Sequence, residues 1–105
     1  MNAEEFVKAF YTEKQDLLKE YLSKNAETEV GQLIKSLNLT SEQSLIMKNL
    51  MNTALTDVFY TIFLGLDGCA SIGGVQEDYE LKDENGNPLS GDIEGYAYDY
   101  FQEEN

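Results

Sequence analysis

Carboxylates are the side chains of this 105-residue chain best able to do chemistry, and most of them lie in its second half. Residues 53–105 hold twelve acids and one lysine, whereas residues 1–52 hold eight acids and six lysines. Carboxylates fixed on folded structure create an electric field that a cationic partner can recognise. A tyrosine among them adds a ring that packs and a hydroxyl that hydrogen-bonds. The predicted partner-binding residues are Asp92, Glu94, Tyr98 and Asp99 on a C-terminal helix, with Glu77, Asp78 and Glu80 on a preceding hairpin.

The residue types that are missing argue against most enzymatic schemes. The chain has no histidine, which removes most general acid–base catalysts and most activated serine or cysteine nucleophiles. It also has no arginine, the usual bidentate clamp for phosphate and carboxylate substrates. Cys69 follows a predicted helix end among acids, where a thiol pKa is raised, and it is expected to be a small buried side chain. We therefore expect no enzymatic activity, no cofactor and no metal.

Two glycine-containing loops leave alternatives open. Residues 67–74 join a helix end to three glycines, so their backbone amides could accept an anion, or the glycines could simply let the chain reverse. Residues 83–87 carry oxygen-bearing side chains at alternate positions, as a calcium loop does. The glycine of an EF-hand loop stands at position six, whereas Gly86 stands at position four, so a tight turn explains this segment more simply.

Charge and composition narrow the class of protein. A net charge of −13 and a pI of about 4.1 disfavour direct binding to nucleic acid or anionic lipid. No stretch reaches the roughly 18 consecutive apolar residues of a membrane span, and the acidic N-terminus lacks the features of a secretory signal. A lone cysteine fits a reducing compartment. We expect a cytoplasmic protein with a single domain over residues 1–105, in which a helical part (1–66) precedes an acidic part (67–105).

Hydrophobic spacing predicts three helices in the first part, over residues 3–24, 28–38 and 41–66. Thr28 is the expected N-cap of the second helix, and either Thr40 or Ser41 is the expected N-cap of the third. The third helix keeps a 3-4 apolar spacing over about five turns and should be the spine of the fold. Its apolar arc widens from Val58 onward, so this end is expected to be covered on several sides.

The acidic part is expected to contain a β-hairpin and a short helix. Val75, Tyr79 and Leu81 suggest a strand, the turn at residues 83–87 follows, and Pro88-Leu89 suggests a short edge strand. From residue 92 to 101, apolar residues recur at helical spacing, although a strand remains the alternative there. In this helix Tyr98 should point outward, while its other aromatic residues face the core. The expected fold class is therefore α+β and helix-dominated.

Several short stretches resemble small acidic bacterial proteins of the immunity-protein kind. They are Leu66-Asp67-Gly68, Ile72-Gly73-Gly74, Tyr79-Glu80-Leu81, Asp83-Glu84-Asn85-Gly86 and Ile93-Glu94-Gly95-Tyr96-Ala97. The resemblance implies a non-enzymatic protein that neutralises a toxin, and the leading hypothesis is an immunity protein or inhibitor whose acidic face docks a basic protein. Two alternatives stay open: a homodimer that uses an apolar strip on the first and third helices, and a small-ligand or metal-binding domain that uses residues 67–74.

Overall fold

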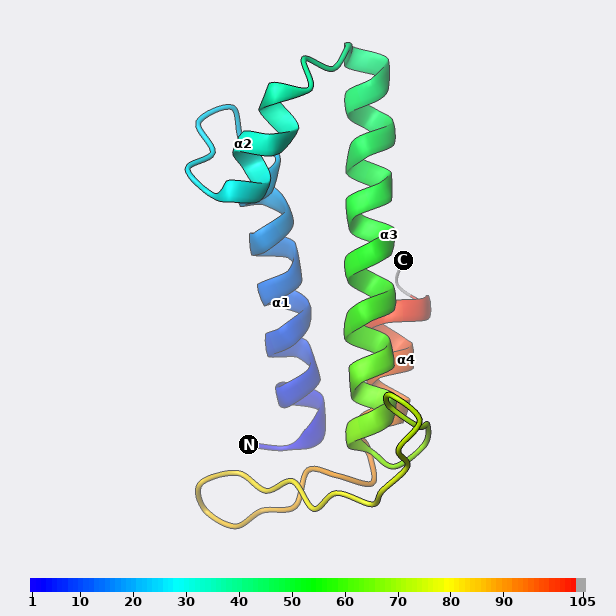
Figure 1. The fold of residues 1–105 in the computed structure, drawn as a ribbon. Helices are drawn as coiled ribbons and strands as arrows, with labels where there is room; N and C mark the ends of the chain where they lie inside the picture. The colour runs from blue at the N-terminus through cyan, green and yellow to red at the C-terminus, as the bar shows by residue number, and fades with distance from the viewer. Residues whose placement is uncertain (104–105) are drawn as a thin grey trace.

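The computed structural model describes residues 1–103, which form an elongated helical hairpin with a smaller helical segment packed at one end (Figure 1). The first and third helices run antiparallel, and the short second helix joins them at the upper end of the figure. The chain then crosses beneath the hairpin and returns as the fourth helix, alongside the lower half of the third. The elements are α1 (Ala3–Tyr21), α2 (Glu29–Ser36), α3 (Ser41–Leu66), α4 (Ile93–Tyr98) and a π-helical turn η1 (Asp99–Glu103).

The predicted helix starts are confirmed, and local capping explains them. Thr40 Oγ1 accepts the backbone N–H of Gln43 at 3.1 Å, and the Gln43 side chain accepts the N–H of Thr40 at 2.9 Å, which forms a capping box. Asn2 and Glu5 form the same arrangement at the start of α1. Thr28 caps α2 through a backbone N–H one turn on, at 3.0 Å. Each cap satisfies donors that the first helical turn leaves unpaired.

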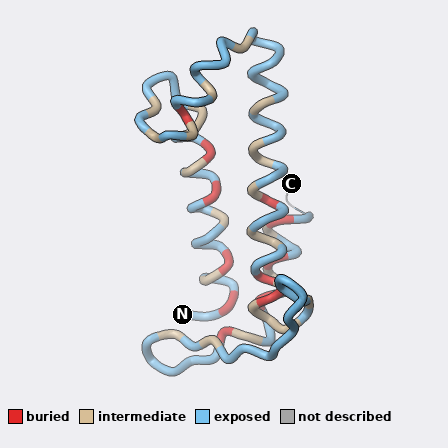
Figure 2. Tube along the Cα trace, viewed as in Figure 1, coloured by how far each residue is buried: buried red, intermediate tan, exposed pale blue. Residues whose placement is uncertain are grey.

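The hydrophobic core lies in the lower half of the molecule, where α1, α3, α4 and η1 meet (Figure 2). Phe101 is fully buried and lies at the centre of an aromatic cluster. Its ring centroid lies 5.4 Å from that of Phe63, 5.5 Å from that of Tyr11 and 5.8 Å from that of Phe59. The buried apolar residues of this core are Ala3, Val7, Phe63, Leu89, Ile93, Ala97 and Phe101.

Lys14 is also fully buried, although in the sequence it only interrupts the apolar stripe of α1. Its ammonium donates a hydrogen bond to Thr56 Oγ1 at 3.0 Å. The same nitrogen lies 4.9 Å from the centre of the Tyr11 ring and 5.6 Å from that of the Phe101 ring, so both rings contribute cation–π attraction. Burial lowers the pKa of Lys14 below its usual 10.5.

The predicted β-hairpin is wrong, so the fold is helical rather than α+β. Between residues 1 and 103 the backbone forms no strand, only two isolated antiparallel bridges, which join Ile72 to Val75 and Lys82 to Pro88. Residues 71–80 are all exposed, so no buried face selects a strand register there. Around the turn at 83–87 the facing segments share only a few backbone bonds, such as the Leu89 N–H to the Leu81 carbonyl at 2.7 Å, because the Asp83 carboxylate takes the Asn87 N–H and Pro88 has no N–H to extend a ladder.

The expectation that the end of α3 is covered on several sides is confirmed only for its last turn. Phe63 is buried in the core and Gly65 lies against Ile72, but Val58 is 54% exposed and Ile62 is 49% exposed. Toward its N-terminus α3 has no buried residue before Thr56, and Figure 2 shows exposed and half-buried residues along its whole upper half. The radius of gyration is 16.2 Å, against about 13 Å for a compact domain of about 100 residues.

Two helical glycines should respond to alanine in opposite directions. A Cβ at Gly31 would clash with Ala26 Cβ, which has no flexible end to move, whereas a Cβ at Gly95 meets no atom within 4 Å. We expect Gly95→Ala to stabilise the protein by about 0.5–1 kcal/mol through helix propensity. At Gly31 the same gain in helix propensity is outweighed by an overpacking cost of about 1–3 kcal/mol, so Gly31→Ala should destabilise the protein. Urea denaturation checks both; equal effects of the two variants would contradict the expectation.

Candidate functional site

The acidic end of the molecule is mounted on the core through α4. Ile93, Ala97 and Phe101 recur every four residues, and all three are fully buried. Glu94 and Tyr98 each follow a buried residue by one position, so they lie about 100° around the helix from it and are exposed, with Tyr98 at 52%. The predicted helix over this segment is confirmed, as are the outward position of Tyr98 and the burial of Phe101. Because the buried face of α4 packs against the core, the directions of Glu94 and Tyr98 are fixed as well.

Asp67 ties the end of α3 to the start of α4. Its Oδ2 accepts the backbone N–H of Glu94 at 2.9 Å, and its Oδ1 accepts the backbone N–H of Gly91. These bonds replace a side-chain cap from Asp92, which makes no capping hydrogen bond and points its exposed carboxylate elsewhere. Asp67 was expected only as part of the loop at residues 67–74. No local pattern indicates that its carboxylate binds amides 24 and 27 residues further on.

Cys69 is exposed, so the expectation of a buried thiol is wrong. Its Sγ donates a hydrogen bond to Glu94 Oε2 at 3.2 Å. That hydrogen bond, with partial desolvation and the negative charges of Glu94 and Asp67, raises the pKa of the thiol to about 11. The group therefore stays protonated near neutral pH, which makes it a poor nucleophile. It serves instead to position the Glu94 carboxylate.

Tyr60 of α3 completes the surface around Glu94. Burial raises its pKa above the usual 10.0, and the neighbouring charges of Glu94, Tyr98 and Cys69 raise it further. These groups therefore lie within electrostatic reach of one another. The site consequently has two tyrosines on either side of a carboxylate, one of them half-buried and the other, Tyr98, open to solvent.

The three acids expected on the hairpin lie on an irregular, exposed segment. Asp78 is close to the same corner, because a Cβ added to Gly68 would lie 2.7 Å from Asp78 Oδ1. Glu80 pairs with Lys82 at 3.2 Å, which partly offsets its charge. Glu77 is exposed and follows Gln76, whose side chain donates to the carbonyl of Gly68 at 3.0 Å. The structure thus brings Asp78 to the site.

Asp99 lies on another face. It lines an open hollow of about 590 Å³ together with Glu4 and Lys8 of α1, Tyr100 and Glu103. Tyr100 donates a hydrogen bond to Glu4 Oε2 at 3.3 Å across this hollow. Asp99 follows Glu94 by five residues, and five residues rotate the side-chain direction by about 140° around a helix axis. The two carboxylates therefore point in different directions. The predicted patch is therefore two surfaces, and we call the one formed by Asp67, Asp78, Glu94 and Tyr98 the acidic corner.

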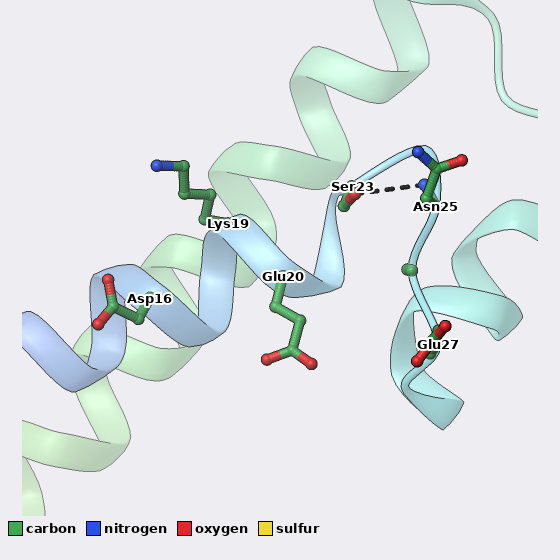
Figure 3. Close-up of a pocket in the computed structure, with 7 residues that line it drawn as sticks. Asp16, Lys19, Glu20, Ser23, Asn25 and Glu27 are labelled. Carbon is green, nitrogen blue, oxygen red and sulfur yellow. Dashed lines mark hydrogen bonds between the residues drawn. The ribbon is translucent and has the colours of Figure 1, made fainter.

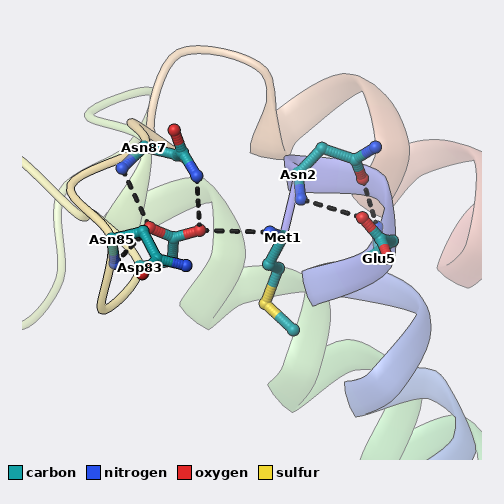
Figure 4. A network of polar contacts seen from close by, with 6 residues as sticks. All are labelled: Met1, Asn2, Glu5, Asp83, Asn85 and Asn87. Carbon is teal, nitrogen blue, oxygen red and sulfur yellow. Dashed lines mark hydrogen bonds and ion pairs between the residues drawn. The ribbon is translucent and has the colours of Figure 1, made fainter.

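A separate polar network fixes the connection between α3 and α4 (Figure 4). Asp83 Oδ1 accepts the backbone N–H groups of Asn85 and Asn87, each at 2.9 Å. Its Oδ2 accepts the Asn87 side-chain amide at 2.9 Å and pairs with the amino group of Met1 at 3.1 Å. These bonds, with those from Asn87 the strongest, hold the pKa of Asp83 well below its usual range. The carboxylate that resembled a calcium ligand is occupied by the protein's own amides.

Several amides of the loop at residues 67–74 are already bonded within the protein, so the loop does not gather its N–H groups around one anion. The N–H of Cys69 donates to the carbonyl of Leu64 at 2.9 Å, and that of Ile72 donates to the carbonyl of Val75 at 2.8 Å. The nearby carboxylates of the acidic corner would also repel an anion. Nowhere in residues 1–103 do three or more His, Cys, Asp or Glu side chains gather closely enough to hold a metal ion. The geometry therefore favours neither form of the small-ligand alternative.

Another hollow, of about 370 Å³, lies where α1 ends (Figure 3). The side chains drawn around it do not converge on a common point, and the hydrogen bond drawn runs from the Asn25 N–H to Ser23 Oγ at 3.2 Å. The hollow is open to solvent and carries both charge signs, so it offers no concentrated chemistry. Its lining residues are Asp16, Lys19, Glu20, Ser23, Asn25, Ala26 and Glu27.

No protein-family model, no curated protein and no solved structure matches this chain. The function therefore has to be argued from the surfaces themselves. None of the helices between residues 1 and 103 combines the length and the apolarity that a membrane-spanning helix requires.

Proposed function

We propose that the protein is a non-enzymatic protein-binding module whose acidic corner docks a protein with a basic surface, as an immunity protein or an inhibitor does. The observation that carries this proposal is the mounting of α4. Three fully buried residues on one side of the helix and the Asp67 clamp at its start hold Glu94 and Tyr98 in fixed positions. A preorganised surface loses little entropy when a partner binds.

The charge of this surface is available to a partner. The ion pairs within residues 1–103 involve Asp83 and Glu80, and neither of them neutralises Asp67, Asp78 or Glu94. Lys82 is the only cation of residues 53–105. Clustered unpaired carboxylates steer a basic partner toward productive encounters and raise the association rate.

Tyr98 supplies the anchoring contact in this proposal. It is half-exposed beside Glu94, and tyrosine is among the residues that dominate binding energy when a partner covers them. The carboxylates around it would form the polar rim that fixes orientation. The single cysteine, which cannot form an internal disulfide, fits action in the reducing cytoplasm.

A capture experiment followed by association kinetics tests this proposal. The full chain is used to capture its partner from cells of the source organism, and association is then measured at rising salt. We expect the on-rate to fall about tenfold between about 0.05 M and about 0.5 M salt. Glu94→Lys should slow association similarly, and Tyr98→Ala should speed dissociation.

Matched variants separate the acidic corner from net charge alone. Glu27→Lys changes an exposed acid at the opposite end of the molecule, and Asp99→Lys changes one on a different face. Both should affect the on-rate much less than Glu94→Lys. If the on-rate does not change with salt, or if all three charge reversals lower it equally, the acidic corner is not the surface that binds the partner.

A further inference from the structure

The face of α3 that points away from the core is an uninterrupted apolar surface. Thr56, Phe59 and Phe63 mark the side of the helix that faces α1 and α4. At 100° per residue, a second set of apolar residues lies on the opposite side. We call this set the outer stripe, and its members, all of them exposed, are Ile46, Leu50, Ala54, Val58 and Ile62. The larger branched members are the most exposed, with Leu50 at 57%, Val58 at 54% and Ile62 at 49%.

The composition of α3 indicates that the outer stripe does not remain exposed to water. Only Glu42, Lys48 and Asp57 are charged among the 26 residues of this helix. Exposed apolar side chains that line up along a helix over this length are typical of an interface. The core of one copy leaves the outer stripe uncovered, so a second molecule is the natural cover for it.

We infer that a second copy of this chain covers the outer stripe, in an antiparallel two-fold dimer with α3 packed against α3. The members of the outer stripe recur every four residues, and such a row forms one of the ridges by which two packed helices interlock their side chains. Ala54, in the middle, allows close approach of the two helices. With the two-fold axis near Ala54, Leu50 of one copy lies opposite Val58 of the other.

The distribution of charge favours a second copy in this orientation. Residues 15–52, which form the end of the molecule beyond the Lys14–Thr56 contact, carry four lysines and five acids, a net charge of −1, while the remaining residues carry −12. An antiparallel arrangement places the nearly neutral end of one copy beside the acidic end of the other, whereas a parallel arrangement would place the two acidic ends together. A strongly basic partner would find no carboxylate within the outer stripe to recognise.

The area of the outer stripe is sufficient for such a dimer. Its side chains expose on the order of 500 Å² per copy, so two copies would bury roughly 1,000 Å², the lower bound for a specific interface. The half-buried Met47 and Met51, which flank the outer stripe, add to this area. We therefore expect the dimer to have a dissociation constant in the micromolar range. The dimer is independent of the acidic corner and would carry one such corner near each end.

Sedimentation equilibrium of the full chain, up to about 200 μM, tests the dimer. We expect a monomer–dimer equilibrium, and we expect Val58→Lys to raise the dissociation constant about 30-fold or more. Thr12→Lys adds the same charge to an exposed position on α1 and should leave the equilibrium unchanged. Circular dichroism of both variants establishes that they remain folded. A wild-type monomer at the highest concentration, or a dimer that tolerates Val58→Lys, would overturn the inference.

Disulfide crosslinking tests the orientation and does not depend on a destabilising charge. In a Cys69→Ser background, Leu50→Cys and Val58→Cys proteins are oxidised separately and as a mixture. We expect the mixed species, which joins the two different variants, to form at least about fivefold faster than either homodimer, because like positions would lie about 12 Å apart along the helix axis. Faster crosslinking of like positions would indicate a parallel dimer and overturn the inference. Crosslinking no faster than in a Thr12→Cys control would overturn it as well.

Discussion

Phe101→Ala is expected to lower the free energy of unfolding by about 3–5 kcal/mol, a large part of the stability of a domain of this size. Phe101 is fully buried and packs against Phe59, Phe63 and Tyr11, so truncation removes contacts with both long helices at once. The cavity would lie between α1, α3 and η1, where the helices on either side limit its collapse. Urea denaturation monitored by circular dichroism measures the change.

Tyr98→Ala is the matched control for Phe101→Ala. It removes an aromatic ring from the same helical segment, three residues away, at a position that is 52% exposed. Its effect on stability should stay within about 0.5–1 kcal/mol. If both variants lose the same stability, the C-terminal segment is not held by its buried face, and the fixed positions of Glu94 and Tyr98 lose their physical basis.

The helices could be predicted from the sequence because their signals are local. Asn2 and Thr40 place hydrogen-bond acceptors at the helix starts, and the left-handed conformations of Asn38 and Gly68 follow the ends of α2 and α3. Apolar spacing then identified the C-terminal helix, including the inward Phe101. Caps and periodicity depend on residues within one or two turns, so they can be read without knowledge of the tertiary fold.

The hairpin was predicted wrongly because only Leu81 and Leu89 of its apparent strands reach the core, too few for a buried sheet face. Val75 and Tyr79 are 54% and 47% exposed, so these apolar side chains do not lie on the buried face of a sheet. The Asn85-Gly86 turn does form, with Gly86 at a φ of 83°. Hydrogen bonds to Asp83 stabilise this turn locally, and the flanking segments need not pair for it to persist.

The candidate site was predicted in part, and the errors concern direction rather than residue type. Glu94 and Tyr98 do share a surface, but Asp99 points toward α1, because the face of a short helix depends on where the helix docks. The bonds from Asp67 and Cys69 join segments 24 to 27 residues apart, which no local pattern shows. The apolar strip on α3 was expected from the breadth of its spacing, and whether a second copy covers it is the question that sedimentation answers.

Lys14→Glu is the second variant with a large expected effect. It places a negative charge where the fold has built a site for a cation, between the Thr56 hydroxyl and the electron-rich faces of Tyr11 and Phe101. A buried charge without compensation costs about 3–5 kcal/mol, so we expect the variant to be largely unfolded or to melt far below the wild type. Lys24→Glu makes the same change at an exposed position and should stay within about 0.5 kcal/mol of the wild type. Equal stability of the two variants would show that the Lys14 pocket is open to water.

The pH dependence of Lys14→Met checks the same site without disrupting it. Methionine has a similar length and fills the pocket, but it binds no proton. Burial lowers the Lys14 pKa below 10.5, so in the window between the lowered pKa and 10.5 the unfolded lysine holds a proton that the folded one has released. Folding of the wild type should therefore grow more favourable with rising pH across that window, relative to Lys14→Met, and should show no such trend below it. Because the tyrosines titrate in both proteins, the difference between their urea-unfolding free energies isolates the lysine. A difference that stays flat up to pH 10.5 would mean that the ammonium keeps its hydration in the folded state, and the assignment of Lys14 to the interior of the fold would fail.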